Sequence, residues 1–309
     1  MNFALRSFLS AGLLAALTLT AHAKIERVIE KTFDVQPDGL LRVETSGGNI
    51  KVDSHASNVV KVVARQKIRA NSESEADDLL KKVELTIEQN SSGVVARAKQ
   101  NRSNWSRNPV QIDFDVTVPT NYRAEIRTSG GNIEVADLAG KVHARTSGGN
   151  IVLGKISSDI DAGTSGGDIR LEEGAASVKL DTSGGNIRVG RAVGPTDLDT
   201  SGGDIVVNSV ENTLRADTSG GNVSATIVGA LKGECYLSTS GGNVRATIDQ
   251  SAAFYLDAST SGGRVDAGGI TITLDGGGQG KNKLAGKVNG GGPVLKLRTS
   301  GGNIDVKTR

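Results

Sequence analysis

Three aspartates in this sequence have the chemistry and the spacing of a cation-binding line. Asp181, Asp199 and Asp217 are equally spaced, and each directly precedes a copy of one repeated motif. If each repeat formed one layer of a stack, the carboxylates would lie about 4.8 Å apart, and a bound cation would relieve their mutual repulsion. Our expectation is a solvated acidic stripe, with weak calcium binding as a hypothesis. The sequence predicts no catalytic residue, no other metal site and no cofactor.

A polar segment, residues 101–109, contains the only tryptophan and is the second candidate site. Trp105 lies between Arg102 and Arg107, a combination that can stack on a sugar ring or bind an anion. The simpler interpretation, which we favour, is a strand connection whose tryptophan packs back on a sheet edge. These three residues are therefore weak candidates for ligand binding.

The cysteine and the histidines do not predict a reactive centre. Cys235 is the only cysteine, so no internal disulfide can form. It occupies a position where other repeats have Val, Ile or Leu, which predicts a small buried apolar side chain. His22, His55 and His143 are scattered along the chain and do not form a metal-binding pattern.

The elements that carry these residues come from the repeated motif, Thr-Ser-Gly-Gly followed by Asn or Asp in most copies. Its copies begin at Thr45, Thr128, Thr146, Thr164, Thr182, Thr200, Thr218, Thr239, Thr260 and Thr299. The spacing is constant from Thr128 to Thr218 and slightly longer for the next two copies. The long gap before Thr299 has Gly-rich sequence, which we interpret as one further irregular coil. A period this short is typical of a β-solenoid, because it cannot hold two helices and a turn.

Alternation of apolar residues predicts two short strands in each coil, one on either side of Ser-Gly-Gly. Val178 and Leu180 precede the motif at Thr182, and Ile187 and Val189 follow it. Stacked coils would bring each such position into a continuous apolar column, and each buried aliphatic side chain contributes roughly 1.5 to 3 kcal/mol. The motif threonine falls on the same inward-facing side of the strand as these apolar residues, and its hydroxyl is expected to form a hydrogen bond with the corner backbone. The Asn or Asp after Gly-Gly is expected to stack as a polar ladder.

The paired glycines are predicted to form the corner between the two strands, where they allow positive φ and close stacking. The corner glycines are Gly130, Gly131, Gly148, Gly149, Gly166, Gly167, Gly184, Gly185, Gly202, Gly203, Gly220 and Gly221. On this basis Gly184→Val is expected to cost at least about 1 to 3 kcal/mol through strain at the corner.

The chain divides into three predicted segments. Residues 1–23 have a positive start, an apolar stretch and a small-residue cleavage site, which together indicate a secretory signal peptide. Residues 24–122 are predicted as a β-rich cap that is continuous with the solenoid and contains one helix. That helix begins at a capping box formed by Ser72 and Glu75. Residues 123–309 hold the serial repeats.

Net charge and residue composition limit the classes of binding partner and the cellular locations that we expect. The formal net charge is +2, or +1 once the signal peptide with Arg6 is removed, so nucleic acid is not a predicted partner. Aromatic residues make up 3% of the chain, which leaves an aliphatic core. The mature chain has no further apolar run of membrane-spanning length. We therefore expect an exported protein, either periplasmic or extracellular and cell-surface.

Several landmarks together resemble one bacterial family. They are Thr-Phe-Asp-Val at residues 32–35, Leu41–Ile50, Asp115–Pro119, the serial Thr-Ser-Gly-Gly copies and Val288–Pro293. Their order over nearly all of the mature chain resembles the bacterial β-strand-repeat family of putative adhesins, a domain of unknown function. The resemblance implies a parallel β-helix-like fold, with a preference for right-handed winding that the periodicity itself does not fix. It also implies an exported protein without assigned catalytic residues.

The sequence thus predicts an all-β protein, a parallel β-solenoid of about ten coils, each of about 18 to 21 residues. Its predicted function is a non-catalytic scaffold for cell-envelope binding, adhesion or structure, with an envelope or extracellular protein or glycan as partner. The alternative is a β-helix enzyme that processes polysaccharides as a lyase or hydrolase, which would need converging carboxylates in a groove.

Overall fold

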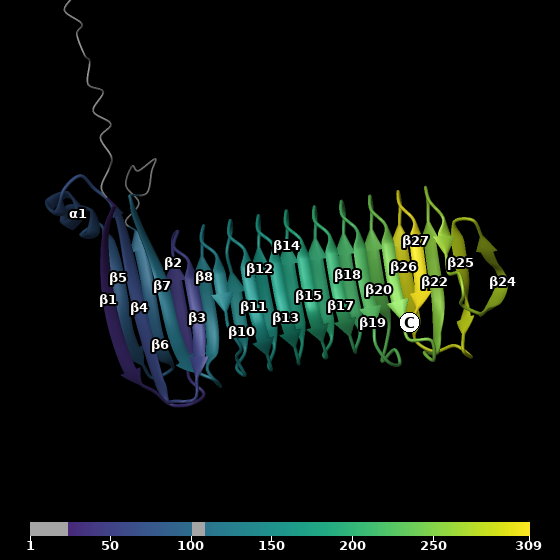
Figure 1. Cartoon of the computed structure of the whole chain (residues 1–309), viewed down its shortest axis with the longest axis horizontal. Coiled ribbons are helices and arrows are strands. Elements are labelled where there is room, and N and C mark those ends of the chain that lie inside the picture. The colour runs from purple at the N-terminus through teal and green to yellow at the C-terminus, as the bar shows by residue number, and fades with distance from the viewer. Residues whose placement is uncertain (1–23, 101–108) are drawn as a thin grey trace, which may run out of the picture.

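The computed structural model describes residues 24–100 and 109–309, and these form an elongated rod (Figure 1). Within this part of the chain the fold is all-β apart from one short helix, α1 (Glu73–Leu80), at one end of the rod. A hairpin of β24 (Ile272–Gly280) and β25 (Lys283–Val288) lies at the other end. The predicted signal peptide, residues 1–23, lies outside the described residues.

The described strands form two sheets, named here sheet A and sheet B. Sheet A has 13 strands, in the spatial order β1 (Lys24–Asp34), β4 (Val59–Arg69), β7 (Val110–Pro119), β3 (Ile50–His55), β9 (Ile133–Val135), β11 (Ile151–Ile156), β13 (Ile169–Gly174), β15 (Ile187–Ala192), β17 (Ile205–Val210), β19 (Val223–Ile227), β21 (Val244–Ile248), β27 (Ile304–Thr308) and β23 (Val265–Asp266). Sheet B has 14, in the order β24, β25, β22 (Phe254–Thr260), β26 (Val294–Thr299), β20 (Cys235–Thr239), β18 (Leu214–Thr218), β16 (Thr196–Thr200), β14 (Val178–Thr182), β12 (Ile160–Thr164), β10 (Val142–Arg145), β8 (Arg123–Thr128), β2 (Leu40–Thr45), β6 (Gly93–Gln100) and β5 (Val83–Asn90).

Each repeat supplies one strand to each sheet, which confirms the predicted parallel β-solenoid. Ile160 pairs with Val178 in sheet B, and Ile169 pairs with Ile187 in sheet A. Both offsets equal the spacing of successive motif threonines, so one sequence period is one coil. All ten motif threonines are buried, in agreement with about ten coils.

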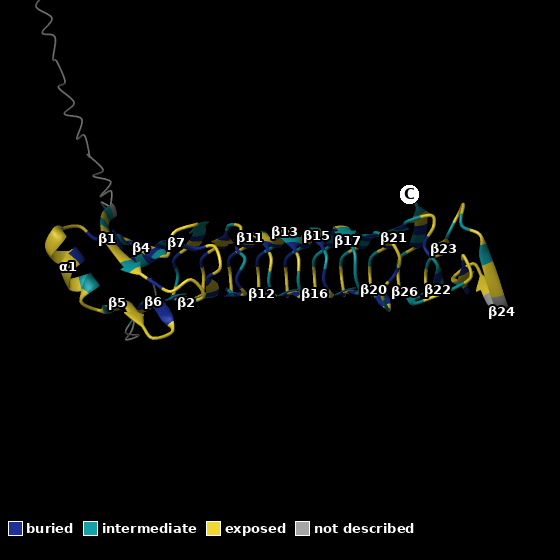
Figure 2. Ribbon diagram, turned by 90° about the horizontal axis from the view of Figure 1, so that it is seen from below, coloured by how far each residue is buried: buried dark blue, intermediate teal, exposed yellow. Residues whose placement is uncertain are grey.

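The core lies between the two sheets, where Figure 2 shows buried residues along the inner faces of both layers. Val178 and Leu180 of sheet B and Ile187 and Val189 of sheet A are each at most 1% exposed. The same alternation recurs in the other coils, so the aliphatic columns predicted from the sequence are present. They supply most of the stabilisation, because apolar burial is the dominant favourable term in folding.

The motif threonine ties each corner to the coil before it. The Thr182 hydroxyl donates a hydrogen bond to the Gly167 carbonyl at 2.9 Å and accepts one from the Gly185 N–H at 3.3 Å. The polar ladder is also present, because the Asn186 N–H donates to Asp168 Oδ1 at 2.7 Å. These bonds satisfy corner backbone groups that would otherwise be unpaired.

Of the two reasons predicted for the corner glycines, the structure shows close stacking and not positive φ. Among the described residues, positive φ occurs at Gly93, Gly229, Gly269, Gly290, Gly291 and Asn289, and at no motif glycine. A Cβ at Gly185 would lie 2.0 Å from the Gly167 carbonyl oxygen, whereas a Cβ at Gly184 would meet no atom closer than 3.5 Å. The second glycine is therefore the constrained one, and the first glycine has room for a Cβ without backbone strain.

The leading strands extend both sheets beyond the first coil. Strands β1, β4 and β7 are antiparallel, and β7 then runs parallel to β3. Strand β7 takes the place of a preceding coil, because Asp113 accepts the Asn49 N–H at 2.8 Å and the Ile112 carbonyl accepts the Thr45 hydroxyl at 3.1 Å. The strands before residue 122 thus lie in the same two sheets as the repeats, while the exact domain boundary stays a prediction.

Helix α1 begins at the predicted residue. Ser72 is its N-cap, and its Oγ accepts the Glu75 N–H at 3.2 Å. The Glu75 carboxylate accepts the N–H of Asn71 at 2.8 Å, one residue before the cap. Ala76 is buried on the inner face of the helix.

The C-terminal end differs from the prediction of an extra coil in the long gap between Thr260 and Thr299. That gap forms the antiparallel hairpin β24–β25, in which β25 also pairs with β22. The last coil, β26 and β27, is then inserted between the coil of β20–β21 and the coil of β22–β23. The threonine bonds agree, since Thr299 donates to Gly242 and Thr260 donates to Gly302. Sequence order and stacking order therefore diverge here.

Candidate functional site

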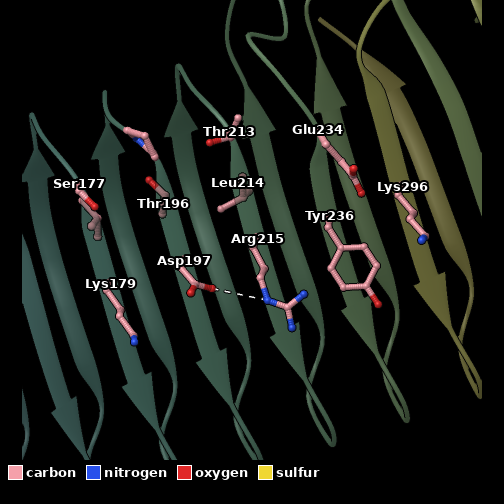
Figure 3. Close-up of a pocket in the computed structure, with 12 residues that line it drawn as sticks. Ser177, Lys179, Thr196, Asp197, Thr213, Leu214, Arg215, Glu234, Tyr236 and Lys296 are labelled. Atoms are coloured by element: carbon pink, nitrogen blue, oxygen red, sulfur yellow. Dashed lines mark ion pairs between the residues drawn. The ribbon is translucent and has the colours of Figure 1, made fainter.

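A groove of about 680 Å³ lies on the outer face of sheet B, across strands β14, β16, β18, β20 and β26 (Figure 3). Its charged and aromatic lining consists of Lys179, Asp197, Arg215, Glu234, Tyr236 and Lys296. Side-chain hydroxyls of Ser177 and Thr213 lie along one margin. The groove is open, and its lining combines charged side chains with apolar surface.

Register brings these residues into one line. Lys179 pairs with Asp197, Asp197 with Arg215, Arg215 with Tyr236, and Tyr236 with Lys296. Each occupies the same place before its motif threonine, so its side chain points away from the core while the neighbouring column is buried. Each of these coils therefore contributes one side chain to the floor of the groove.

Tyr236 lies between two cations. The Arg215 Cζ is 5.2 Å and the Lys296 Nζ 5.6 Å from the centroid of its ring, within the range of cation–π attraction. In Figure 3 the ring is seen face-on between these two side chains, so one face is turned outward. The arrangement offers a flat aromatic surface flanked by positive charge.

The cations of the groove differ in how far they are already neutralised. Arg215 Nε lies 3.7 Å from Asp197 Oδ1, and its Nη2 lies 3.1 Å from Asp217 Oδ2. Within the described part of the chain, Lys179 and Lys296 form no ion pair within 4 Å. The two lysines at the ends of the line thus remain available to an anionic ligand.

The predicted acidic stripe is in register, because Asp181 pairs with Asp199 and Asp199 with Asp217. Burial, together with the Asp217 charge, raises the pKa of the Asp199 carboxyl. The outer two carboxylates have basic partners, Arg145 at 3.4 Å from Asp181 and Arg215 at 3.1 Å from Asp217. Asp199 is therefore the carboxylate with the least compensation.

Gly163 explains how Arg145 reaches Asp181 across the coil that lies between them. A Cβ at this position would lie 2.4 Å from Asp181 Oδ2 and 2.6 Å from Arg145 Nη1. The missing side chain leaves space for the guanidinium of Arg145, which also bonds to Asp161 at 2.6 Å. In the described residues no group of three or more His, Cys, Asp or Glu side chains is arranged to hold a metal ion, so calcium binding stays a hypothesis.

The remaining predicted candidates are separate from the groove floor. Arg102, Trp105 and Arg107 lie outside the described residues. Cys235 is fully buried as predicted, and burial raises the pKa of its thiol, which disfavours the reactive thiolate.

The two histidines of the described residues lie in different parts of the rod. His55 Nε2 lies 2.9 Å from the Val59 carbonyl oxygen, and His143 Nδ1 lies 3.2 Å from Asp161 Oδ2. Each of these two rings thus has a local hydrogen-bond partner.

Sequence reasoning missed the groove, although part of the signal was present. The repeats place Lys179, Asp197, Arg215, Tyr236 and Lys296 at the same offset before the motif. The acidic stripe predicted from the sequence occupies a different offset, directly before the threonine. No local pattern indicates that residue 296 lies next to residue 236, because that contact depends on the insertion of the last coil.

None of the helices in residues 24–100 and 109–309 is both long and apolar enough to span a bilayer. The family model described as Toastrack DUF4097 matches residues 40–307. This chain is also similar to solved structures named "putative adhesin". Those from Parabacteroides merdae and Parabacteroides distasonis have 10% and 13% identity, and each match covers 92% of this chain. The matches cover 96% and 97% of those chains, with TM-scores of 0.44 and 0.41. No curated protein matches this chain.

Proposed function

We propose, since this chain belongs to the Toastrack DUF4097 family, that it is an exported scaffold of the cell envelope that binds other envelope components without chemical turnover. The periplasm and the outer cell surface are both compatible with this role. The outer face of sheet B supplies the binding site.

The observation that carries the proposal is the groove around Tyr236. Two stacked sheets hold its side chains on strands, so little conformational entropy is lost when a ligand binds. A rigid, open groove with one aromatic ring and several charges is suited to recognition of an extended polar molecule. The rod presents this groove on a long hydrogen-bonded framework, which suits a protein that connects components.

Binding is preferred to catalysis because of how the carboxylates of the groove are held. Glycosidic hydrolysis needs two carboxyl groups that act on opposite sides of one bond. Asp197 is already engaged by Arg215 at 3.7 Å, and Glu234 lies at the margin of the groove (Figure 3). This arrangement supports a role for both as surface charges.

The test is photo-crosslinking in the native envelope. A photoreactive amino acid placed at Lys296 is expected to capture a periplasmic or cell-surface component, and the same amino acid placed at Arg170 on sheet A serves as the control. Capture should be lost in the Tyr236→Ala background. Equal capture from both positions would contradict a site on sheet B.

Turnover is tested on the purified protein. Incubation with bacterial and plant polysaccharides is expected to give neither new reducing ends nor unsaturated products. Product formation that disappears in Asp197→Asn or Glu234→Gln would overturn the non-catalytic proposal and support the polysaccharide-processing alternative.

A further inference from the structure

We propose that the groove around Tyr236 binds an acidic polysaccharide, with one sugar ring stacked on Tyr236 and ligand carboxylates paired with Lys179 and Lys296. This inference rests on the proposed binding function and names the ligand class of that site. It follows from the aromatic ring in the groove, the charges at its two ends and the lack of an exposed large hydrophobic side chain in its lining.

The aromatic ring of Tyr236 provides the stacking surface. Tyr236 is partly exposed and lies next to Lys296 near one end of the line, and its outward face is visible in Figure 3. A tyrosine in this position is rigid and flat with few rotatable bonds, so it loses little entropy on binding. The apolar face of a sugar ring matches such a surface, and the hydroxyls of Ser177 and Thr213 elsewhere in the groove lining can exchange hydrogen bonds with sugar hydroxyls.

The terminal lysines set the length and the charge of the ligand. Lys179 and Lys296 lie on β14 and β26, with three strands between them. At about 4.8 Å per strand, their backbones are on the order of 19 Å apart, which is the length of a short oligosaccharide rather than of a single sugar. Because neither lysine forms an ion pair among the described residues, a polymer with regularly spaced carboxylates can engage both ends.

The charge within the groove is consistent with this choice. Its lining has three cations, Lys179, Arg215 and Lys296, and two anions, Asp197 and Glu234. Asp197 is paired with Arg215 at 3.7 Å, so the excess positive charge lies at the two ends. Glu234, at the margin, can accept a hydrogen bond from a sugar hydroxyl.

A protein partner fits this surface less well. Stable protein interfaces have an apolar core surrounded by polar residues, and this groove has a single aromatic ring in place of such a core. The exposed large hydrophobic side chains of the described residues are Val28, Val152 and Leu274, and none of them lines the groove. An open, charged groove with one partly exposed aromatic ring is better matched by a sugar polymer.

The groove is also completed by the inserted C-terminal coil. Lys296 belongs to β26, which lies between β20 and β22. Without that insertion, β22 would be the next strand in sequence order, and it carries Asp257 at the position that pairs with Lys296. The insertion thus places a cation, rather than a carboxylate, beside Tyr236.

The experiment is calorimetric titration of the full mature chain with oligogalacturonate and with its methyl ester. The ester keeps the sugar and removes the charge. We expect the acid to bind, the ester to bind at least about tenfold more weakly, and added salt to weaken binding of the acid. Equal affinity for acid and ester, or no binding of either, would overturn the proposed ligand class.

Variants locate the site on the protein. Tyr236→Ala is expected to weaken binding of the acid at least about tenfold, as for a central aromatic contact, whereas Tyr236→Phe should retain most of it. Lys296→Gln should also weaken binding, while its matched control Lys155→Gln on sheet A should not. Unchanged affinity in both Tyr236→Ala and Lys296→Gln would place the ligand elsewhere and overturn the proposal.

The crosslinking experiment separates this inference from the broader function. If position 296 captures a protein through the intact groove and the titration shows no binding of acidic oligosaccharide, the glycan assignment is wrong while the scaffold role stands. If neither experiment detects a ligand, both proposals fail.

Discussion

The central coils and the C-terminal end use the same motif but are assembled differently. From β10 to β19, each coil stacks on the one before it in the sequence. At the C-terminal end, the coil of Thr299 is inserted between the coil of Thr239 and the coil of Thr260, and the threonine bonds follow this spatial order. The motif therefore determines how any two coils join, while it leaves open which two coils are neighbours.

The largest expected effect concerns the corner of a central coil. Gly185→Ala places a Cβ 2.0 Å from the Gly167 carbonyl oxygen, so the stacked backbone must move. We expect a loss of about 4 kcal/mol or more in the free energy of unfolding, measured by denaturant titration. Gly184→Ala, with 3.5 Å of space, is the matched control and should cost less than about 1 kcal/mol. Similar costs for both would refute the close-approach explanation.

The second prediction tests whether the last coil is truly interior. Leu297 of β26 and Leu198 of β16 are both fully buried, so each change to Ala should cost about 3 kcal/mol. If the last coil were instead the exposed end of the rod, Leu297→Ala would cost much less than Leu198→Ala. Parallel thermal and denaturant unfolding of the two variants distinguishes these outcomes.

The third prediction compares the threonine bond in both regions. Thr182→Val removes a hydroxyl that bonds to Gly167 and Gly185, and Thr299→Val removes the same pair of bonds to Gly242 and Gly302. Each change leaves buried backbone groups without partners and should cost about 1 to 3 kcal/mol. A clear difference between the two variants in unfolding free energy would show that the inserted coil is held by other contacts.

The smallest expected effect concerns charge in one outward column of sheet B. Asp199 lies between two carboxylates, whereas the corresponding position of the last coil is Arg298, whose guanidinium pairs with Asp257. Burial and the Asp217 charge raise the pKa of the Asp199 carboxyl in the folded state. The protonated carboxyl therefore favours the folded protein at a pH below the pKa of Asp199 in the unfolded chain. This contribution to the free energy of unfolding is lost as the pH rises through the pKa of Asp199 in the folded protein.

Asp199→Asn should therefore stabilise the protein at neutral pH, by a few tenths of a kcal/mol up to about 1 kcal/mol because solvent screens the stripe. It should have no such effect at a pH below the unfolded pKa of an aspartate. Thermal unfolding over this pH range measures both limits, and a melting temperature of the variant that is lower than that of the wild type at neutral pH would contradict the assignment. Addition of calcium in the same experiment tests the cation hypothesis, because a bound cation would raise the melting temperature of the wild type only.

Much of the fold could be predicted from local pattern. The constant spacing of the motif, the alternation around residues 178–189 and the capping box at Ser72 indicated the coil, its two strands and the helix start. These are short-range features, and backbone geometry converts them directly into structure. The positions of Thr182 and Cys235 in the apolar alternation also indicated their burial, because side chains on a strand alternate between its two faces.

Local sequence thus specifies the repeating coil, its aliphatic core and its polar corner bonds. The stacking of coils selects which glycine of each pair is constrained, because that depends on the distance to the carbonyl oxygen of the neighbouring coil. Stacking also places β26 beside β20, since coils that carry the same motif have nearly the same stacking surfaces and the motif cannot specify their order. Tyr236 and Lys296 are distant in the sequence and paired in the sheet, so the candidate site exists only in the assembled stack.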